Sequence, residues 1–448
     1  MSYRILFKKT IAVIMSVTIT VCLTACLSIR ADELYRLPEV SEEYLKLQGQ
    51  LNAILDLGAE YSPPTSGLNR QTVQFVDLDR TGTNEVIAFF ALPASGTLRV
   101  YIFNILDGDY VIAEIIEGVG TAFDSVRYAD MDGDGVREIL VGWQMSSALK
   151  HMSIYSIKDY HAVLLAKAEY SMLTVYDLSE DGNADVMVFR LPTEETGAVA
   201  EVLMMMPDGE IVSAEARLSN GIEVISRVLT GKLTDGANAV FVDSEGKFDD
   251  GNLVTDICVF KDGVFTNISA KSQSGVSEET VRNRQQSLDM RGDGIITVPI
   301  PRLLKAQSET AYYAIDWYAF SSSGMSTLSL TTFHNNFDEW YLILPYNWRG
   351  KVSVRREDIV SGERTVIFSY ITGDEGQYED FLKIYKLSGD MAEERVRFPG
   401  RTMLLKEDVA VYAFELLAPP NSFGLTYDEA LIKENFRLIY SEWLAGTN

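Results

Sequence analysis

The stretch that decides the fold is DMDGDGVRE at residues 130–138, which the apolar run ILVGW at residues 139–143 follows at once. Carboxylate side chains stand at its first, third, fifth and ninth positions, and a glycine stands at its sixth. Glycine permits the sharp turn that directs such oxygens toward one centre. Carboxylates packed together repel one another unless a cation lies among them. The segment therefore predicts a cation-binding loop that leads directly into a β-strand.

The same pattern recurs along the chain. It reads DLDRTGTNE at residues 77–85, DLSEDGNAD at 177–185 and, in a changed form, DMRGDGIIT at 289–297. Around each copy the sequence breaks into about four short β-type runs with turn residues between them. A four-strand unit that repeats at this length is typical of a β-propeller blade.

We therefore predict a mainly β fold, with a β-propeller of about five four-stranded blades over residues 66–334 and a smaller α+β domain over 335–448. The predicted blades cover residues 66–119, 120–168, 169–217, 218–276 and 277–334. The fourth blade keeps a glycine turn near residue 230 but lacks the acidic residues. Six or seven blades remain an alternative, because the later boundaries are poorly marked.

Two helices are also predicted. Residues 41–58 carry apolar residues at helical spacing, with Ser41 as N-cap and Gly58 as the stop. Near the end of the chain, Thr426 and Glu429 have the spacing of a capping box ahead of LIKENFRLIYSEWL at residues 431–444.

Calcium is the cation that the loops fit best, because it takes six to eight hard oxygen ligands. Side-chain oxygens stand at positions one, three, five and nine of the first three loops, and position seven offers a backbone carbonyl. The predicted ligands are Asp77, Asp79, Thr81, Thr83, Glu85, Asp130, Asp132, Asp134, Val136, Glu138, Asp177, Ser179, Asp181, Asn183 and Asp185.

The four loops are not equally complete. The loop at 130–138 is complete, whereas Thr81 supplies only a neutral oxygen in the first loop and should weaken binding there. In the loop at 289–297, Arg291 stands at a ligand position and Thr297 replaces the last acid. We expect that loop to be structural and to be held by contacts between Arg291 and aspartate. A solvated Asp-Gly turn without metal is the alternative for all four.

An EF-hand would need a glutamate at position twelve, where this chain has Ala88, Val141, Val188 and Ile300. The arrangement instead resembles the FG-GAP/VCBS repeats, the calcium-loop blades that also occur in integrin α-subunit propellers. In that family the loop joins the first two strands of a blade. A second, weak resemblance links FDEWYLILPYNWRGKVSV at residues 337–354 to PsbP-like α/β domains.

The N-terminus has the features of an export signal. Basic residues precede an apolar run at residues 11–22, which is short for a membrane span. The following Leu23-Thr24-Ala25-Cys26 resembles the bacterial lipobox. The resemblance implies a lipoprotein signal peptide over 1–26, acylation of Cys26 by palmitate-type chains, and a tether with the helix over 27–65. The protein would be extracytoplasmic and lipid-anchored to the bacterial cell membrane. An ordinary cleaved signal is the alternative.

The charge of the chain argues against one class of partner. The formal net charge is −25, which argues against nucleic acid as a partner, because phosphate contacts need cationic side chains. Cys258 follows a β-type pattern and is predicted to be a buried apolar residue. We expect a non-catalytic binding or scaffold module with a protein or glycan ligand on the propeller face. The alternative is an extracellular enzyme that acts on a glycan or envelope polymer through a pair of carboxylates.

Overall fold

The computed structural model describes residues 42–439, apart from residues 148, 159–160, 272, 284, 306, 308 and 374–376. The predicted signal peptide, Cys26 and the tether up to residue 41 lie outside the described residues, as does the end of the predicted C-terminal helix. In the described part, every helix falls short of the length and apolar character that a membrane span requires.

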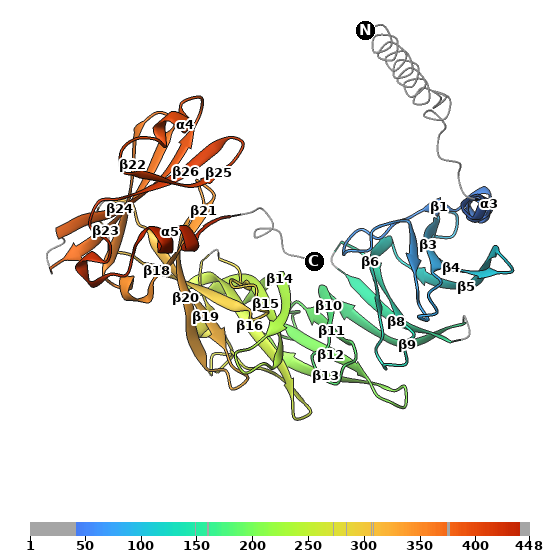
Figure 1. The fold of residues 1–448 in the computed structure, drawn as a ribbon. Coiled ribbons are helices and arrows are strands. Elements are labelled where there is room, and N and C mark those ends of the chain that lie inside the picture. The colour runs from blue at the N-terminus through green and yellow to red at the C-terminus, as the bar shows by residue number, and fades with distance from the viewer. Residues whose placement is uncertain are drawn as a thin grey trace, which may run out of the picture.

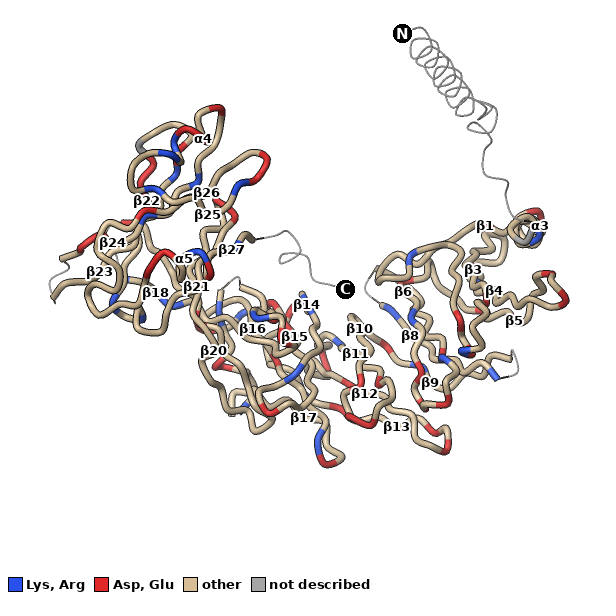
Figure 2. Tube along the Cα trace, viewed as in Figure 1, with Lys and Arg blue, Asp and Glu red and all other residues tan. Residues whose placement is uncertain are grey.

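Six antiparallel β-sheets follow one another along a curved, open arc (Figure 1). Each of the first five sheets contains four consecutive strands joined as a meander, and the first and fifth sheets gain one further strand. Figure 2 shows acidic and basic positions interspersed along the whole arc.

The first sheet carries the N-terminal helix α3 (Glu42–Asp56), whose residues Leu47, Leu51 and Ile54 are buried against it. The helix ends at Asp56, and the predicted stop residue Gly58 follows in a turn with φ +88°, whereas Ser41 lies outside the described residues. The strands of this sheet are β1 (Glu60–Tyr61), β2 (Val73–Val76), β3 (Glu85–Leu92), β4 (Thr97–Leu106) and β5 (Asp109–Val119).

The next three sheets have four strands each. The second contains β6 (Ala122–Ala129), β7 (Glu138–Gln144), β8 (Lys150–Lys158) and β9 (His161–Tyr170). The third contains β10 (Met172–Tyr176), β11 (Asp185–Arg190), β12 (Val199–Met205) and β13 (Ile211–Arg217). The fourth contains β14 (Ile222–Lys232), β15 (Asn238–Phe248), β16 (Gly251–Lys261) and β17 (Val264–Asn267). Cys258 is fully buried in β16, as predicted.

The last two sheets have five strands each. The fifth contains β18 (Thr297–Leu303), β19 (Tyr313–Phe320), β20 (Ser326–Asn335), β21 (Trp340–Leu344) and β27 (Phe436–Leu438). The sixth contains β22 (Val352–Val360), β23 (Glu363–Thr372), β24 (Gln377–Ser388), β25 (Arg401–Lys406) and β26 (Ala410–Leu416). The short helices are η1 (Glu278–Thr280), η2 (Tyr346–Trp348), α4 (Ala392–Arg395), η3 (Ser422–Gly424) and α5 (Glu429–Asn435).

Apolar cores lie between consecutive sheets, so that each sheet is covered by the next. The prediction of a mainly β fold built from successive four-stranded antiparallel sheets is confirmed, whereas the number of propeller blades stays a prediction: among the described residues, no strand pairing or shared apolar core joins the first sheet to the fifth. The fifth sheet instead shares its core with the sixth, through residues such as Trp340, Phe368 and Phe414. Because the sixth sheet covers the face on which a closing blade would pack, the arc stays open.

The predicted C-terminal domain also needs correction. Strand β21 lies beyond the predicted boundary at residue 335, yet it pairs with β20 and completes the fifth sheet. The predicted helix at 431–444 stops at Asn435, because the chain then forms β27 and buries Phe436 beside Trp340. Asp428, and not Thr426, is its N-cap and accepts a hydrogen bond from the Leu431 amide. This region is therefore mostly β rather than α+β.

Candidate metal centres

The first three acidic loops occupy equivalent places in the first three sheets. Each loop joins the first and second strands of its sheet: β2 to β3, β6 to β7 and β10 to β11. In each case the residue before the loop pairs with position nine, so that Val76, Ala129 and Tyr176 face Glu85, Glu138 and Asp185. The predicted position of the loop, between the first two strands, is therefore the observed one.

The fourth loop keeps this register although only one bridged residue, and no full strand, precedes it. An isolated antiparallel bridge pairs Leu288 with Thr297, which begins β18. The strand before this loop has thus shrunk to one bridge, and β18 corresponds to the second strand of the other sheets. The fifth sheet gains β21 and β27 at its other side.

All four loops share one backbone conformation. The residue at position four has positive φ: 53° at Arg80, 75° at Gly133, 62° at Glu180 and 70° at Gly292. The glycine at position six has φ between 84° and 93° in every loop. Only glycine adopts such a conformation without a steric cost, which explains the residue type at position six. The two left-handed residues fold the loop back on itself and bring positions one to five together.

In each of the first three loops, the acid at position nine accepts a hydrogen bond from the backbone amide at position two. Glu85 and Glu138 accept hydrogen bonds from the amides of Leu78 and Met131 at 2.8 and 2.9 Å. Asp185 accepts from the Leu178 amide at 2.8 Å and also from the Ser179 amide. Burial raises the pKa of all three carboxyls, that of Glu138 to about 7. These anions are therefore desolvated at a position where a cation would stabilise them.

Two of the loops bring their carboxylates close enough to hold a metal ion. Oxygens of Asp77, Asp79 and Glu85 lie within 4.8 Å of one another, and so do those of Asp130, Asp132 and Asp134. Among the predicted ligands of the third loop, Asp177, Asp181 and Asp185 are acidic, and Ser179 supplies a hydroxyl.

Two oxygens in these loops are buried without a hydrogen-bond partner among the described residues: Oδ1 of Asp77 and Oδ1 of Asp177. The other carboxylate oxygens of the two aspartates, Oδ2, accept hydrogen bonds from Gly82 and Gly182, each at 3.1 Å. Buried polar atoms usually have a partner, and the same arrangement occurs in two separate loops. The oxygens therefore fit a cation.

The remaining predicted ligands line the same turns. Thr81 and Asp181 each accept a hydrogen bond from the amide at position seven, that of Thr83 and Asn183 respectively. The Val136 amide likewise donates to Asp134. The structure thus places the predicted side chains of each loop around one turn.

Adjacent loops are hydrogen-bonded into a row. The Arg137 amide in the second loop donates to the Leu78 carbonyl in the first at 2.7 Å, and the Ala184 amide in the third donates to the Asp130 carbonyl in the second. Asn238, at the start of β15, extends the row by donating from its side chain to the Asp177 carbonyl. Sequence reasoning did not find this row, because each bond joins residues that lie more than 50 positions apart.

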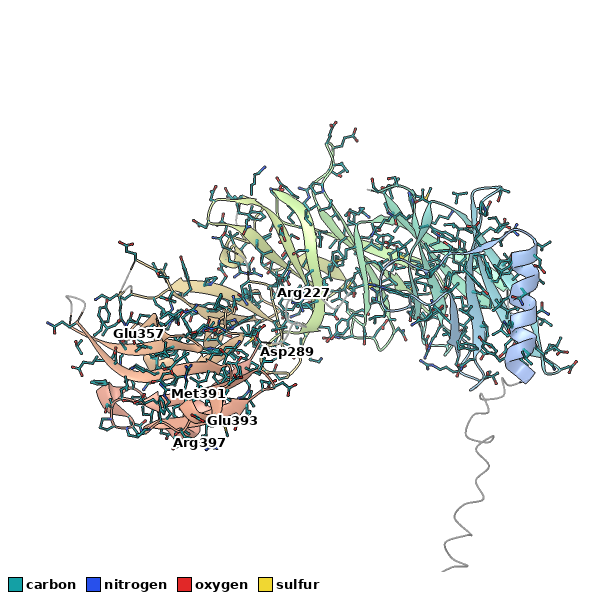
Figure 3. The ribbon with its side chains drawn as sticks, turned by 90° about the horizontal axis from the view of Figure 1, so that it is seen from above. Arg227, Asp289, Glu357, Met391, Glu393 and Arg397 are labelled. Carbon is teal, nitrogen blue, oxygen red and sulfur yellow. The ribbon has the colours of Figure 1, made fainter. Side chains whose placement is uncertain are left out.

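The fourth loop closes without a metal cluster in the described residues. Asp289 accepts hydrogen bonds from four loop amides, of which those of Gly292 and Gly294 lie at 2.8 Å. The prediction that the Arg291 side chain contacts an aspartate is wrong, because the Arg291 guanidinium donates to Ser329 in β20. Figure 3 labels Asp289, which lies where the ribbon passes into the C-terminal sheets.

A polar pocket of about 230 Å³ was not predicted from the sequence. It is lined by the segment 66–68, by β6, by the start of β8 and by the link from β9 into β10, together with Val228 of β14. Its charged residues are Asp124, Arg127 and Lys150. The only sequence signal for it is a charged residue within the β6 strand pattern, which does not by itself indicate a pocket.

No protein-family model matches the chain, and no curated protein sequence matches it. Two solved structures show a distant likeness. A protein from Lactobacillus plantarum is 10% identical with a TM-score of 0.31, over 71% of this chain and 85% of that one. The exotype rhamnogalacturonan lyase YesX is 11% identical with a TM-score of 0.28, over 72% of this chain and 75% of that one.

Proposed function

We propose that this protein is a lipid-anchored extracytoplasmic binding module whose sheets are stabilised by calcium ions in the loops at 77–85, 130–138 and 177–185. The observation that carries the proposal is the pair of buried oxygens without a partner among the described residues, Asp77 Oδ1 and Asp177 Oδ1. They occur at the same turn of two different sheets, next to carboxylates whose ionised form is disfavoured by burial.

Calcium suits this donor set better than other common metals. The loops offer carboxylate, hydroxyl and carbonyl oxygens, the hard ligands that calcium prefers, and no histidine or cysteine stands in them. The row of hydrogen bonds between the loops gives such ions a structural role, because each loop is bound both to its own strands and to the next sheet. A ligand that binds only the folded state stabilises it.

The pocket favours binding over acid-base hydrolysis. It contains one carboxylate, Asp124, both of whose oxygens are engaged: Lys150 lies 2.8 Å from Oδ1, and the Tyr170 hydroxyl donates to Oδ2 at 2.6 Å. Glycosidases generally use two carboxylates about 5–10 Å apart. We therefore propose that a protein or glycan ligand is held without chemistry, while acylated Cys26 attaches the module to the membrane.

Thermal unfolding of the full-length protein, kept in solution with a non-ionic detergent, tests the calcium proposal. Excess calcium should raise the midpoint by at least about 3 °C relative to a chelator. Asp134→Ala should remove much of this shift, because Asp134 stands at position five of the most complete loop. Asp293→Ala, at the same position of the fourth loop, is the matched control and should keep the shift. An equal midpoint with calcium and with chelator would reject the proposal.

A further inference from the structure

The pocket beside β6 contains an arginine that forms no ion pair with any described residue. Arg127 lines the pocket, and its Nε is shielded from solvent and has no hydrogen-bond partner. Within the described part of the chain, neither a hydrogen bond nor an ion pair reaches its guanidinium. Arginine presents five donors in a rigid fork that fits a carboxylate or a phosphate. A partly buried guanidinium without a partner is costly for the free protein, and a bound anion would remove that cost.

The other two charges of the pocket neutralise each other. Lys150 forms an ion pair with Asp124 at 2.8 Å, and the remaining oxygen of Asp124 accepts the Tyr170 hydroxyl. Arg127 therefore leaves the pocket with one net positive charge, although the whole chain carries −25. Burial lowers the pKa of the Arg127 guanidinium, and the charge of Asp124 only partly opposes this. The pocket thus attracts an anion on a protein that otherwise repels anions.

The local backbone is arranged so that the pocket can form. The pairing of β6 with β7 is irregular between Phe123 and Val126, so Asp124 and Ser125 form a bulge. Bulges redirect side chains and are frequent beside functional sites. Opposite the bulge, a Cβ on Gly142 would lie 2.2 Å from the Tyr170 hydroxyl and 2.9 Å from Ser125 Oγ. Glycine at this position therefore leaves the space in which Tyr170 reaches Asp124.

A separate segment forms one wall of the pocket. The amides of Thr65 and Ser66 donate to the carbonyls of Phe123 and Asp124 at 3.1 and 2.7 Å, and Asn69 donates to the Val126 carbonyl. The wall and the β6 bulge are thus fixed to each other. Hydroxyl groups of Ser66, Ser125, Ser171 and Tyr170 accompany Arg127 in the lining, beside the apolar Leu68, Met172 and Val228.

We propose that this pocket binds a small ligand through an oxyanion group, a carboxylate or a phosphate, which accepts hydrogen bonds from the Arg127 guanidinium. The serine and tyrosine hydroxyls would hold polar groups on the rest of the ligand. This inference rests on the proposed binding function and names its ligand class. The pocket shares no residue with the three acidic loops, so the two proposals can fail separately.

Calorimetric titration of the calcium-loaded full-length protein tests the inference with three related probes: glucose, glucuronate and glucose 6-phosphate. Glucuronate or glucose 6-phosphate should bind with a Kd below about 10 mM, and glucose should bind at least about tenfold more weakly. A preference between the two anions tells whether the site takes a carboxylate or a phosphate. Either preference supports the inference.

Arg127→Gln should weaken binding of the anionic probe by more than about tenfold, because it removes charge-assisted hydrogen bonds. Arg397→Gln removes the same charge from an exposed position in the C-terminal part (Figure 3) and should leave binding unchanged. If neither anion binds a folded, calcium-responsive protein, or if Arg127→Gln binds as the wild type does, the inference is wrong and the calcium proposal stands. If calcium has no effect on stability but Arg127 is required for anion binding, the calcium proposal is wrong and the anion-binding inference stands.

Discussion

Arg80 in the first acidic loop forms an ion pair with Asp130 in the second, with 3.2 Å between Nη2 and Oδ2. Arg80 stands at position four, with the positive φ shared by all four loops, and its Cδ lies 3.8 Å from the place of a Cβ on Gly135. A residue of one candidate metal centre thus reaches a predicted ligand of the next. In the absence of metal, this guanidinium is the counter-charge of Asp130.

Removing the Arg80 side chain should strengthen calcium binding in the second loop. Arg80→Ala abolishes a positive charge that competes with the metal for Asp130, and exposed pairs of this kind are worth up to about 1 kcal/mol. We expect calcium affinity to rise by about two- to fivefold, measured by competition with a chromophoric chelator. Arg397→Ala, which removes an exposed charge elsewhere, is the control. A lower affinity in Arg80→Ala would show that Arg80 supports the loop and does not compete with calcium.

The loops should also make stability depend on pH. Burial raises the pKa of Glu138 to about 7, and the neighbouring Asp132 and Asp134 add to this, whereas the bond from the Met131 amide opposes it. The metal-free folded state therefore holds this proton more tightly than the unfolded state. The contribution of Glu138 to stability is favourable at low pH and is lost as the pH rises from about 4.5 to about 7.

In chelator, the midpoint of thermal unfolding should fall more steeply for the wild type than for Glu138→Gln between about pH 5 and about pH 8. The stabilisation by calcium should grow over the same interval, because the ion binds the deprotonated carboxylate. Parallel pH profiles for the two proteins would contradict the raised pKa of Glu138.

The close approach of Tyr170 to Gly142 predicts that any side chain at position 142 destabilises the protein. In Gly142→Ala the new methyl group would meet the Tyr170 hydroxyl at 2.2 Å, and the bond from Tyr170 to Asp124 would have to break or shift. We expect a loss of about 1–3 kcal/mol in the free energy of unfolding by denaturant. Gly197→Ala is the control, because nothing lies within 4 Å of its Cβ position. Equal stability of the two variants would mean that the β6 bulge adapts freely.

A buried ion pair fixes the segment that links the fourth and fifth sheets. Arg282 and Asp243 lie 3.1 Å apart with 0% and 1% of their side chains exposed, and Thr255 and Ser287 complete the hydrogen bonds of Asp243. Arg282→Ala would remove the ion-pair partner of the buried Asp243 and leave only the electrostatic interaction with Arg227, and we expect a loss of at most about 3–5 kcal/mol.

Lys271→Ala breaks an exposed pair with Glu279 in the same segment and should cost less than about 1 kcal/mol. Comparing the losses in the free energy of unfolding of the two variants by chemical denaturation separates the effect of breaking a buried ion pair from that of losing a positive charge. Similar losses for Lys271→Ala and Arg282→Ala would show that the buried hydrogen bonds around Asp243 do not stabilise the segment.

Short-range features were predictable from the sequence, because they depend on neighbouring residues. The positions of the acidic loops follow from the glycine at position six and from the apolar strand after position nine, and the strands of the first four sheets follow from the same repeat. The apolar residue at position two, buried at Leu78, Met131 and Leu178, is also visible as a repeat.

The remaining features depend on contacts between distant residues. Thr426 and Asp428 both suit a helix N-cap, and the choice is decided by Asn347, which donates a hydrogen bond to the Thr426 hydroxyl. The open arc depends on which sheet covers the fifth, and the reach of Arg80 to Asp130 depends on how two sheets pack. None of these relationships leaves a periodic signal in the sequence.

The most direct test of the central claim is a calorimetric titration of calcium into the chelator-treated full-length protein. We predict saturable binding of three ions per chain, with the second loop tightest, and the loss of one ion when Asp132 and Asp134 are both changed to alanine. Heat no larger than that of dilution, or a stoichiometry unchanged by the double substitution, would contradict the assignment of calcium to these loops.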